Sequence, residues 1–327
     1  MKILITGGAG FIGTHLINEL IKRAEKKKER ISIDVVDDLS SSSFTKEKKA
    51  FFAKHKIKFF RTTVKKYSVA GKRYGQIYHL ASPVGPAGVL KYAGIMGDVI
   101  LSDTLKMANL AIKNKARLLF ISTSEVYGPG RVSRRRGQAE HINKIVPHEV
   151  TVRLEYGVGK LIAEIALINL AKVSKLKFNI VRPFNIIGPY QNGESGFVVP
   201  RFVKSALKNE PLTIFGNGEQ LRCFTHVLDI VDSMIRLMDS NFENKIYNVG
   251  NPKNTCSIRK LAEKIVRLSN SQSEIAFVDP KELYGPLYTE AWNKIPNIQL
   301  IKDELKWEPK RALTDIIKEY VEYCRLT

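Results

Sequence analysis

The sequence predicts an α/β protein with a doubly wound parallel sheet and a smaller C-terminal lobe. From residue 1 to about 180, short apolar runs alternate with helix-like segments, the order that a parallel sheet with crossover helices requires. From about 185 onward, Pro and Gly become frequent and the elements shorten. We therefore expect a domain over residues 1–184 and a lobe over residues 185–327, with some of the later chain returning to the first domain.

The elements of the first domain are predicted from their apolar patterns. The expected strands are Lys2–Thr6, Ile33–Val36, Phe59–Thr62, Ile77–Leu80, Arg117–Ile121 and Asn179–Arg182. The expected helices are Phe11–Glu29, Val99–Asn114 and Tyr156–Lys172.

The stretch ILITGGAGFIGTHL joins the first strand to the first helix. Gly7, Gly10 and Gly13 form a Gly-x-x-Gly-x-x-Gly pattern, and Phe11 and Ile12 open the helix. Glycines allow a tight turn and a close backbone approach to a pyrophosphate, while the helix N-terminus offers free amides and a positive dipole end. Because a strand precedes the pattern and a helix follows it, we expect a Rossmann-type dinucleotide site rather than a purely structural turn.

The second strand ends in acids that bear on the choice of dinucleotide. Asp37 lies 24 residues after Gly13, near the roughly 20 expected for the acid that binds the ribose. An acid there favours two free ribose hydroxyls and repels the extra phosphate of NADP, so residues 1–184 are predicted to bind NAD. Asp38 is expected at the adenine edge. The alternative for Asp37 is a solvated acid at a strand end.

Tyr156 and Lys160 stand four residues apart at the head of an apolar, helix-like run. On a helix they share a face. Tyrosine has a pKa of about 10, so accepting a proton near neutral pH requires a drop of about 3 units. We expect Lys160 and the positive nicotinamide ring to lower the pKa of Tyr156, which then takes a proton from a substrate hydroxyl. The alternative is a core tyrosine beside a surface lysine.

The run LLFISTSEVYG is an apolar strand that ends in hydroxyl groups. Ligands of open α/β sheets bind at the carboxyl ends of strands. We expect Thr123 to hydrogen-bond the reacting oxygen and Glu125 to move a proton on a neighbouring carbon. The alternative for Glu125 is a solvent-facing loop acid.

Composition limits the partners and the compartment. The net charge of +21 fits an anionic small substrate or nucleic acid, but a lysine-rich solvated surface is the simpler explanation, and we expect no nucleic acid. Part of the charge lies in Arg134–Arg136. Three scattered cysteines give neither a disulfide framework nor metal-ligand spacing, which suits the cytoplasm. We expect no signal peptide and no membrane span.

Six motifs in order, TGGAGFIG, VVDDLS, HLAS, STSEVYG, YGVGK and RPFNIIGP, resemble the extended short-chain dehydrogenase/reductase family. The resemblance covers nearly the whole chain. It implies an NAD-dependent enzyme that acts on a nucleotide-diphosphate sugar, because the family consists mostly of nucleotide-sugar epimerases, dehydratases and decarboxylases.

The resemblance also implies roles for individual residues. It places NAD at Gly7, Gly10, Gly13, Asp37 and the loop Leu80, Ala81 and Ser82. It makes Thr123, Tyr156 and Lys160 the catalytic trio, with Tyr156 and Lys160 also touching the cofactor. Asn185 and Arg222 match residues that grip the nucleotide diphosphate, and Phe215 is expected to shape a slot for the base.

The subfamily signals conflict. Gly159 stands where a Ser usually precedes the catalytic Lys. Lys294 stands where decarboxylases carry an Arg two residues before the Pro, which argues against a carboxylated substrate. Ser124 replaces the Asp of glucose-type dehydratases, yet Thr-Ser-Glu resembles decarboxylases and mannose-type dehydratases.

Several functions therefore stay open. We narrowly favour an epimerase that works through a transient 4-keto sugar with NAD retained and recycled. A UDP-glucuronate-type decarboxylase or a 4,6-dehydratase using Glu125 is the alternative, and a non-catalytic dinucleotide- or RNA-binding protein is the rival from another class. The family also implies a homodimer through the helices expected at 99–114 and 156–172.

Overall fold

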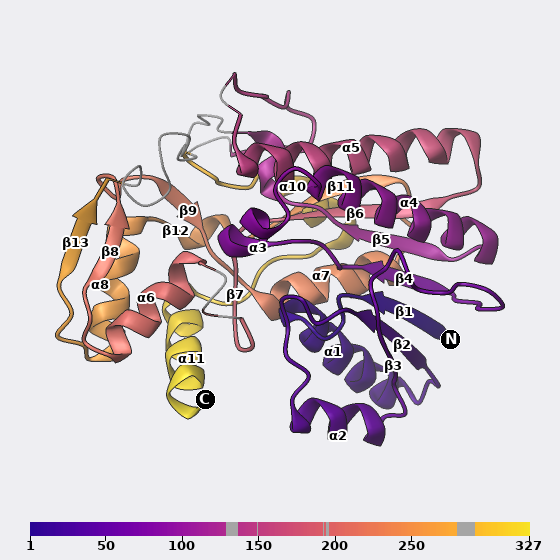
Figure 1. Cartoon of the computed structure of the whole chain (residues 1–327), viewed down its shortest axis with the longest axis horizontal. Coiled ribbons are helices and arrows are strands. Elements are labelled where there is room, and N and C mark those ends of the chain that lie inside the picture. The colour runs from indigo at the N-terminus through magenta and orange to yellow at the C-terminus, as the bar shows by residue number, and fades with distance from the viewer. Residues whose placement is uncertain (129–136, 149, 192, 194–195, 280–291) are drawn as a thin grey trace.

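A computed structural model of the chain describes residues 1–327 except 129–136, 149, 192, 194–195 and 280–291 (Figure 1). The basic run Arg134–Arg136 lies outside the described residues. Among the described residues, no helix has the length and apolar character needed to cross a membrane.

A seven-stranded sheet forms the centre of the molecule, in the order β11-β6-β5-β4-β1-β2-β3. All neighbouring strands in it pair in parallel. Its strands are β1 (Lys2–Thr6), β2 (Ser32–Asp37), β3 (Lys58–Arg61), β4 (Gln76–His79), β5 (Arg117–Ile121), β6 (Lys177–Pro183) and β11 (Lys245–Val249). The predicted Rossmann-type fold is confirmed, and the six expected strands are all present within one or two residues of their predicted ends.

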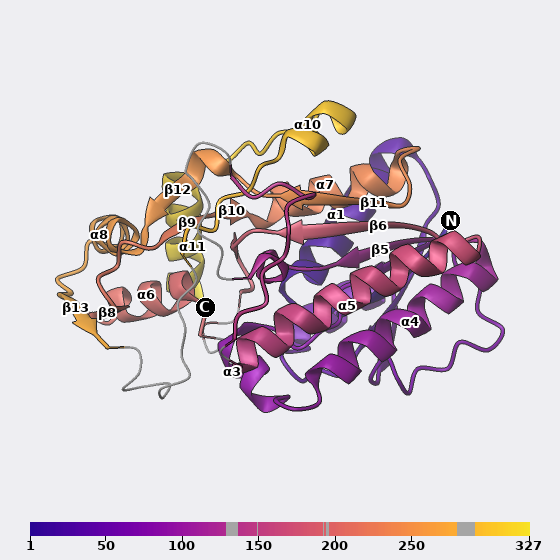
Figure 2. The same ribbon diagram turned by 90° about the horizontal axis from the view of Figure 1, so that it is seen from above.

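Helices cover both faces of this sheet (Figures 1 and 2). They are α1 (Phe11–Lys27), α2 (Lys46–Lys54), α3 (Gly85–Lys91), α4 (Met96–Asn114), α5 (Val152–Val173), α7 (Val227–Asp239) and α10 (Gln299–Leu305). Ile3 and Ile5 of β1 join a core with α1 and α7, whereas Leu4 joins a core with α4 and α5. Alternate residues of one strand thus anchor the two layers.

The second lobe is built from short elements. Its strands form three two-stranded pairs, β10 (Thr225–His226) with β7 (Ile186–Ile187), β12 (Thr255–Ser257) with β9 (Leu221–Cys223), and β13 (Ile275–Val278) with β8 (Leu212–Phe215). Its helices are α6 (Val198–Leu207), α8 (Ile258–Ser269) and α11 (Leu313–Leu326). These helices share a separate apolar core. The domain boundary at 184/185 stays a prediction, and β11 and α7 from the later chain belong to the central sheet and its covering layer.

Two helices begin earlier than the sequence predicts. The sequence predicts that α5 starts at Tyr156, but the hydroxyl of Thr151 accepts a hydrogen bond from the Leu154 amide and caps the helix, which begins at Val152. The sequence predicts that α4 starts at Val99, but the helix begins at Met96, where the Glu155 carboxylate accepts hydrogen bonds from the amides of Gly94 and Met96. One short segment of α5 therefore also fixes the start of α4.

Candidate active site

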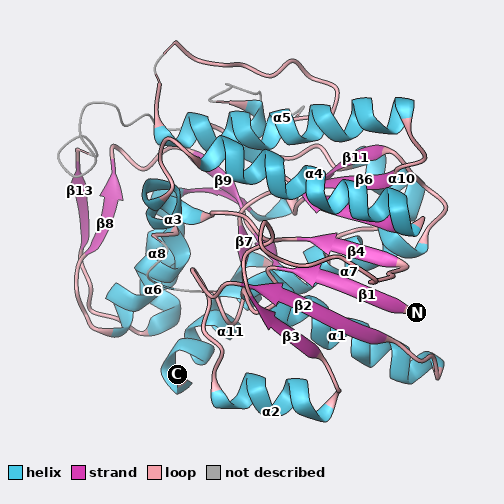
Figure 3. Cartoon of the chain, turned by 45° about the vertical axis from the view of Figure 1, so that its right-hand side comes forward, coloured by secondary structure: helices cyan, strands magenta, loops and turns pink. Residues whose placement is uncertain are grey.

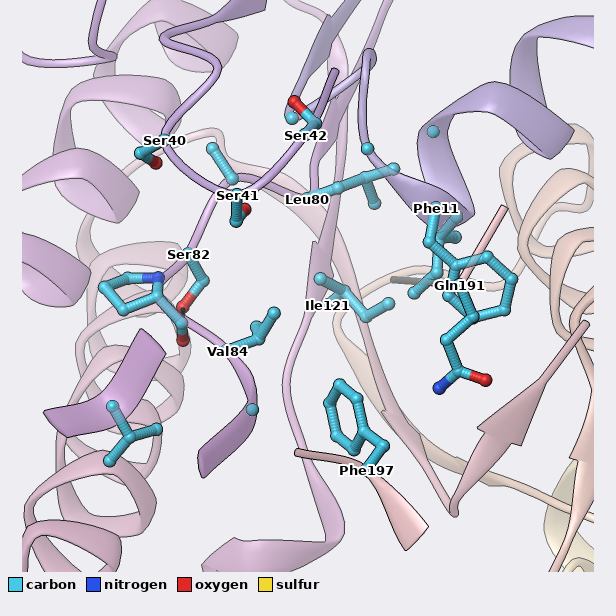
Figure 4. Close-up of a pocket in the computed structure, with 18 of the residues that line it drawn as sticks. Phe11, Ser40, Ser41, Ser42, Leu80, Ser82, Val84, Ile121, Gln191 and Phe197 are labelled. Atoms are coloured by element: carbon cyan, nitrogen blue, oxygen red, sulfur yellow. Dashed lines mark hydrogen bonds between the residues drawn. The ribbon is translucent and has the colours of Figure 1, made fainter. Parts of the chain in front are cut away.

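A cavity of about 2340 Å³ lies between the carboxyl ends of the strands and the second lobe. Figure 3 shows the arrowheads of β1 to β4 pointing toward that lobe. Every site residue predicted from the sequence lines this cavity: Gly7, Gly10, Phe11, Ile12, Gly13, Asp37, Asp38, Leu80, Ala81, Ser82, Thr123, Glu125, Tyr156, Lys160, Asn185, Phe215 and Arg222. In Figure 4, Ser40 and Ser41 lie on one side of the space and Phe11 and Gln191 on the other.

The glycine loop has the shape that a dinucleotide needs. Gly7 has φ of +71°, and a Cβ atom on Gly13 would lie 2.4 Å from the Gly7 carbonyl oxygen. Side chains at these two positions would therefore strain or push apart the loop. Gly10 begins α1 without a side-chain cap, and the first turn of α1 contains no acid. Its amides are thus left for an anionic group, so these residues fit the diphosphate of NAD.

The carboxylate of Asp37 already accepts hydrogen bonds from other groups of the protein. Its Oδ2 atom accepts a hydrogen bond from the Ala9 amide at 3.0 Å, and its Oδ1 atom accepts from the Leu39 amide at 2.8 Å and from Ser42 Oγ at 3.1 Å. Burial raises the pKa of Asp37, although these hydrogen bonds act in the opposite direction and lower it in part. A carboxylate offers about four acceptor positions, so one remains for a ribose hydroxyl. Asp38 accepts a hydrogen bond from the Ser40 amide.

Tyr156 and Lys160 lie on α5, and Thr123 lies at the end of β5. A hydrogen bond links Thr123 to Tyr156, but burial dominates and raises the pKa of Tyr156. Lys160 Nζ donates to the Ile121 carbonyl at 2.8 Å, and the lowering of the Tyr156 pKa by Lys160 together with the nicotinamide ring stays a prediction. Burial, opposed by the charge of Glu164, lowers the pKa of Lys160 to about 7.

A buried ion pair, which no sequence motif indicates, lies next to Lys160 and the end of β5. Arg182 is paired with Glu164, and both side chains are almost fully buried. Glu164 also accepts a hydrogen bond from Ser122 Oγ at 2.5 Å. Ser122 stands between Ile121, which holds Lys160, and Thr123, which holds Tyr156. The pair thereby fixes the end of β5 against α5.

Glu125 lies between two cations. Arg153 donates to it through Nε at 2.8 Å and through Nη2 at 3.1 Å, and Lys294 forms a second ion pair with it. Burial raises the pKa of Glu125, but the charges of Arg153 and Lys294 outweigh burial and bring the pKa well below its usual range. Glu125 therefore stays ionised. Burial, opposed by Glu125, lowers the pKa of Lys294 to about 7.

Lys294 reaches this position through a short extended segment. Its amide donates to the Leu221 carbonyl at 3.2 Å, next to the bridge between Arg222 and Lys294. The side chain of Lys294 is only 2% exposed. Lys294 stood out in the sequence only as a departure from a motif, and Arg153 did not stand out at all.

The residues expected to hold the nucleotide come from the second lobe and the segment before it. Asn185 Nδ2 donates to the Cys223 carbonyl at 2.9 Å, and Arg222 Nη1 donates to the Leu221 carbonyl at 2.9 Å. The guanidinium of Arg201 lies 4.3 Å from the centre of the Phe215 ring. This stack gives Phe215 a fixed, flat surface at the lobe side of the cavity.

The model of the NAD dependent epimerase/dehydratase family matches residues 3–250. The chain belongs to this family. Its members are enzymes, and both the predicted enzyme class and the predicted cofactor NAD are confirmed. The family match covers the sheet and most of the cavity-lining residues.

Curated relatives align along nearly the whole chain. The UDP-N-acetyl-alpha-D-glucosaminuronate decarboxylase of Bacillus cytotoxicus is 29% identical over 99% of this chain and 98% of the relative. The UDP-glucuronic acid decarboxylase 1 of Xenopus tropicalis is 34% identical over 99% of this chain and 72% of the relative. The UDP-glucose 4-epimerase structure from Thermotoga maritima matches 100% of this chain and 99% of its own, with a TM-score of 0.85 and 25% identity.

Proposed function

We propose that the enzyme decarboxylates a nucleotide-linked uronic acid through a transient 4-keto sugar, with NAD retained and recycled. The observation that carries this proposal is the pair of cations, Arg153 and Lys294, that meet at Glu125. One carboxylate between two cations leaves a positive charge in the cavity, which suits the carboxylate of a sugar acid. Lys294 places a cation at the position where decarboxylases carry an Arg. The decarboxylase relatives support the same reaction class.

The proton chemistry at the sugar C4 belongs to Tyr156. Bound NAD supplies a hydride acceptor and, when oxidised, a positive charge that favours the ionised phenol. Tyr156 Oη takes the proton from the C4 hydroxyl, Thr123 holds the same oxygen, and Lys160 keeps the end of β5 in place through the Ile121 carbonyl. Tyr156 gives the proton back when the C4 hydroxyl is restored.

The cations act on the carboxylate. Once C4 is a carbonyl, the carboxyl group on C5 is β to it. The C5–C6 bond breaks, carbon dioxide leaves, and the electron pair moves onto the C4 oxygen as an enolate, which then takes a proton from water at C5. Arg153 and Lys294 orient the carboxylate before cleavage, and Glu125 balances their charge afterwards. Because Glu125 stays ionised, it suits this role better than the proton donor of a 4,6-dehydratase.

We assign the nucleotide to the lobe side of the cavity. Asn185 and Arg222 supply donors toward the diphosphate, and Phe215 supplies a surface for the base. A β-bridge pairs Arg222 with Lys294, so adjacent backbone segments would bind the diphosphate and the sugar carboxylate.

C4 epimerisation, which the sequence narrowly favoured, is the second candidate. The likeness to the UDP-glucose 4-epimerase of Thermotoga maritima supports it. In that case Glu125, Arg153 and Lys294 would shape the sugar pocket without taking part in bond cleavage.

The deciding experiment is mass spectrometry of the products formed from UDP-glucuronate, UDP-N-acetylglucosaminuronate and UDP-glucose with catalytic NAD. Loss of carbon dioxide from an acidic sugar supports decarboxylation. A new chromatographic peak of unchanged mass supports epimerisation, and loss of water supports dehydration. Either of the last two results rejects the decarboxylase proposal.

We also propose that the enzyme is a homodimer. On α5, the side chains of Ile162 and Ile165 are 45% and 48% exposed, and they lie on the same face of the helix. Exposed isoleucines on a helix that packs beside α4 are suited to an interface with a second copy.

A further inference from the structure

One lysine of a basic segment turns inward, and the proposed function leaves it unused. The segment around α2 carries exposed Lys46, Lys49 and Lys54. Lys48, on the same helix, is instead half-buried and lines the cavity. A buried charge needs a compensating partner, so the groups around the Lys48 ammonium indicate its role.

Lys48 Nζ contacts three separate parts of the chain. It donates to the Ala9 carbonyl in the glycine loop at 2.7 Å and to the Ser43 carbonyl at 3.1 Å. It also lies 5.8 Å from the centre of the Tyr190 ring, which follows β7. Burial lowers the pKa of Lys48 and the charge of Asp37 opposes this shift. Two neutral carbonyls leave one of the three ammonium hydrogens available.

The position of this ammonium group matches an anion that the cofactor brings. Ala9 directly precedes Gly10, where α1 begins without a side-chain cap or an acid in its first turn. The diphosphate of NAD is the anionic group that such a loop and helix end receive. We infer that Lys48 is a cofactor-binding residue that donates to the diphosphate of NAD and ties the glycine loop to Tyr190 beside it. This inference rests on NAD binding and is independent of which sugar reaction follows.

The consequence is tighter retention of the cofactor. The loop Ser40 to Ser43 and α2 lie on one side of the cavity, and Tyr190 comes from the chain after β7. The ammonium group of Lys48 joins these two sides to the glycine loop, where the diphosphate would bind. Such a contact suits a reaction in which NAD is recycled rather than released.

The test compares Lys48→Met with Lys49→Met, which removes an exposed lysine from the same helix. Dissociation constants of ADP-ribose and adenosine are measured by calorimetry on the purified full-length protein. We expect Lys48→Met to weaken ADP-ribose binding by about tenfold or more, as loss of one charge-assisted hydrogen bond does. Adenosine binding should be unchanged, Lys49→Met should match the wild type, and Lys48→Arg should restore most of the affinity.

Two results would overturn the inference. Unchanged ADP-ribose affinity in Lys48→Met means that Lys48 does not touch the diphosphate. An equal loss for adenosine and ADP-ribose means that Lys48 only holds the loop in shape. Should Lys48→Met fail to fold, Lys48→Gln, which keeps a donor but no charge, is compared with Lys48→Arg by the same two criteria.

Discussion

At the scale of single residues, the site depends on buried charged side chains that compensate one another's charge. Glu125 is ionised because Arg153 and Lys294 contact it, and the charge of Glu125 in turn opposes the lowering of the Lys294 pKa by burial. A substrate carboxylate that enters this group meets a net positive charge. Binding of an acidic sugar should therefore depend on whether Lys294 is protonated.

The first prediction follows from the pKa of Lys294, which burial lowers to about 7. A lowered pKa means that the cation is present below this value and is lost as the pH rises through it. We expect the KM for an acidic nucleotide sugar to rise as the pH increases above about 7, because the positive charge at Lys294 disappears. The measurement is KM as a function of pH with UDP-glucuronate or UDP-N-acetylglucosaminuronate, whichever is turned over.

Lys294→Arg is the matched control, because a guanidinium stays protonated over the whole range. Its KM should lose the rise near neutral pH, while the pH profile of kcat, which reports Tyr156 and Lys160, should keep its shape. If the KM of Lys294→Arg and of the wild type rise together, Lys294 is not the group that binds the carboxylate.

At the scale of elements, α5 shows how far sequence reasoning reaches. The shared face of Tyr156 and Lys160 follows from helical spacing alone. The role of Lys294 does not, because it is brought to Glu125 by backbone pairing with β9, and no local pattern encodes that pairing. Glu164 and Arg182 were missed for the same reason: each looks like a surface charge until the fold buries both. Burial and the charge of Glu125 both raise the pKa of Tyr156, so the lowered pKa stays a prediction for the complex with oxidised NAD.

The second prediction concerns Gly157, which lets the loop of Glu125 approach α5. A Cβ atom at Gly157 would lie 3.0 Å from the Glu125 carbonyl oxygen. Gly157→Ala should favour the helix itself by about 1 kcal/mol but displace Glu125 and its two cations. We expect a fall in kcat/KM of about tenfold with little loss of thermal stability, since about 1.4 kcal/mol of lost transition-state stabilisation has this effect.

Gly97→Ala provides the comparison, because a Cβ atom on Gly97 of α4 meets nothing within 4 Å. It should leave kcat/KM unchanged. Full activity in Gly157→Ala would show that the Glu125 loop tolerates the shift and that its exact distance from α5 does not matter.

At the scale of the whole molecule, the two faces of the central sheet are covered by helices from different parts of the chain. The face under α1 and α7 is sealed by the later chain, which returns as α7 and α10. Figure 2 shows the long helices α4 and α5 side by side on the other face, and the outer surface of α5 carries the exposed Ile162 and Ile165. The same α5 carries Tyr156 and Lys160, so an interface on this face would lie directly behind the active site.

The last prediction tests that interface. Ile162→Asp places a charge on the exposed face of α5, where a second copy would bury it, and Leu326→Asp places one on α11, where the native leucine is 78% exposed. Burying one isoleucine contributes about 1.5–3 kcal/mol, and an unpaired buried carboxylate costs more, so Ile162→Asp should weaken dimerisation by at least about a hundredfold. Light scattering coupled to size-exclusion chromatography should give a dimer for the wild type and for Leu326→Asp, and a monomer for Ile162→Asp with an unchanged circular dichroism spectrum. A wild-type monomer, or a dimer that survives Ile162→Asp, would remove α5 as the contact surface, and the exposed isoleucines would then need another partner.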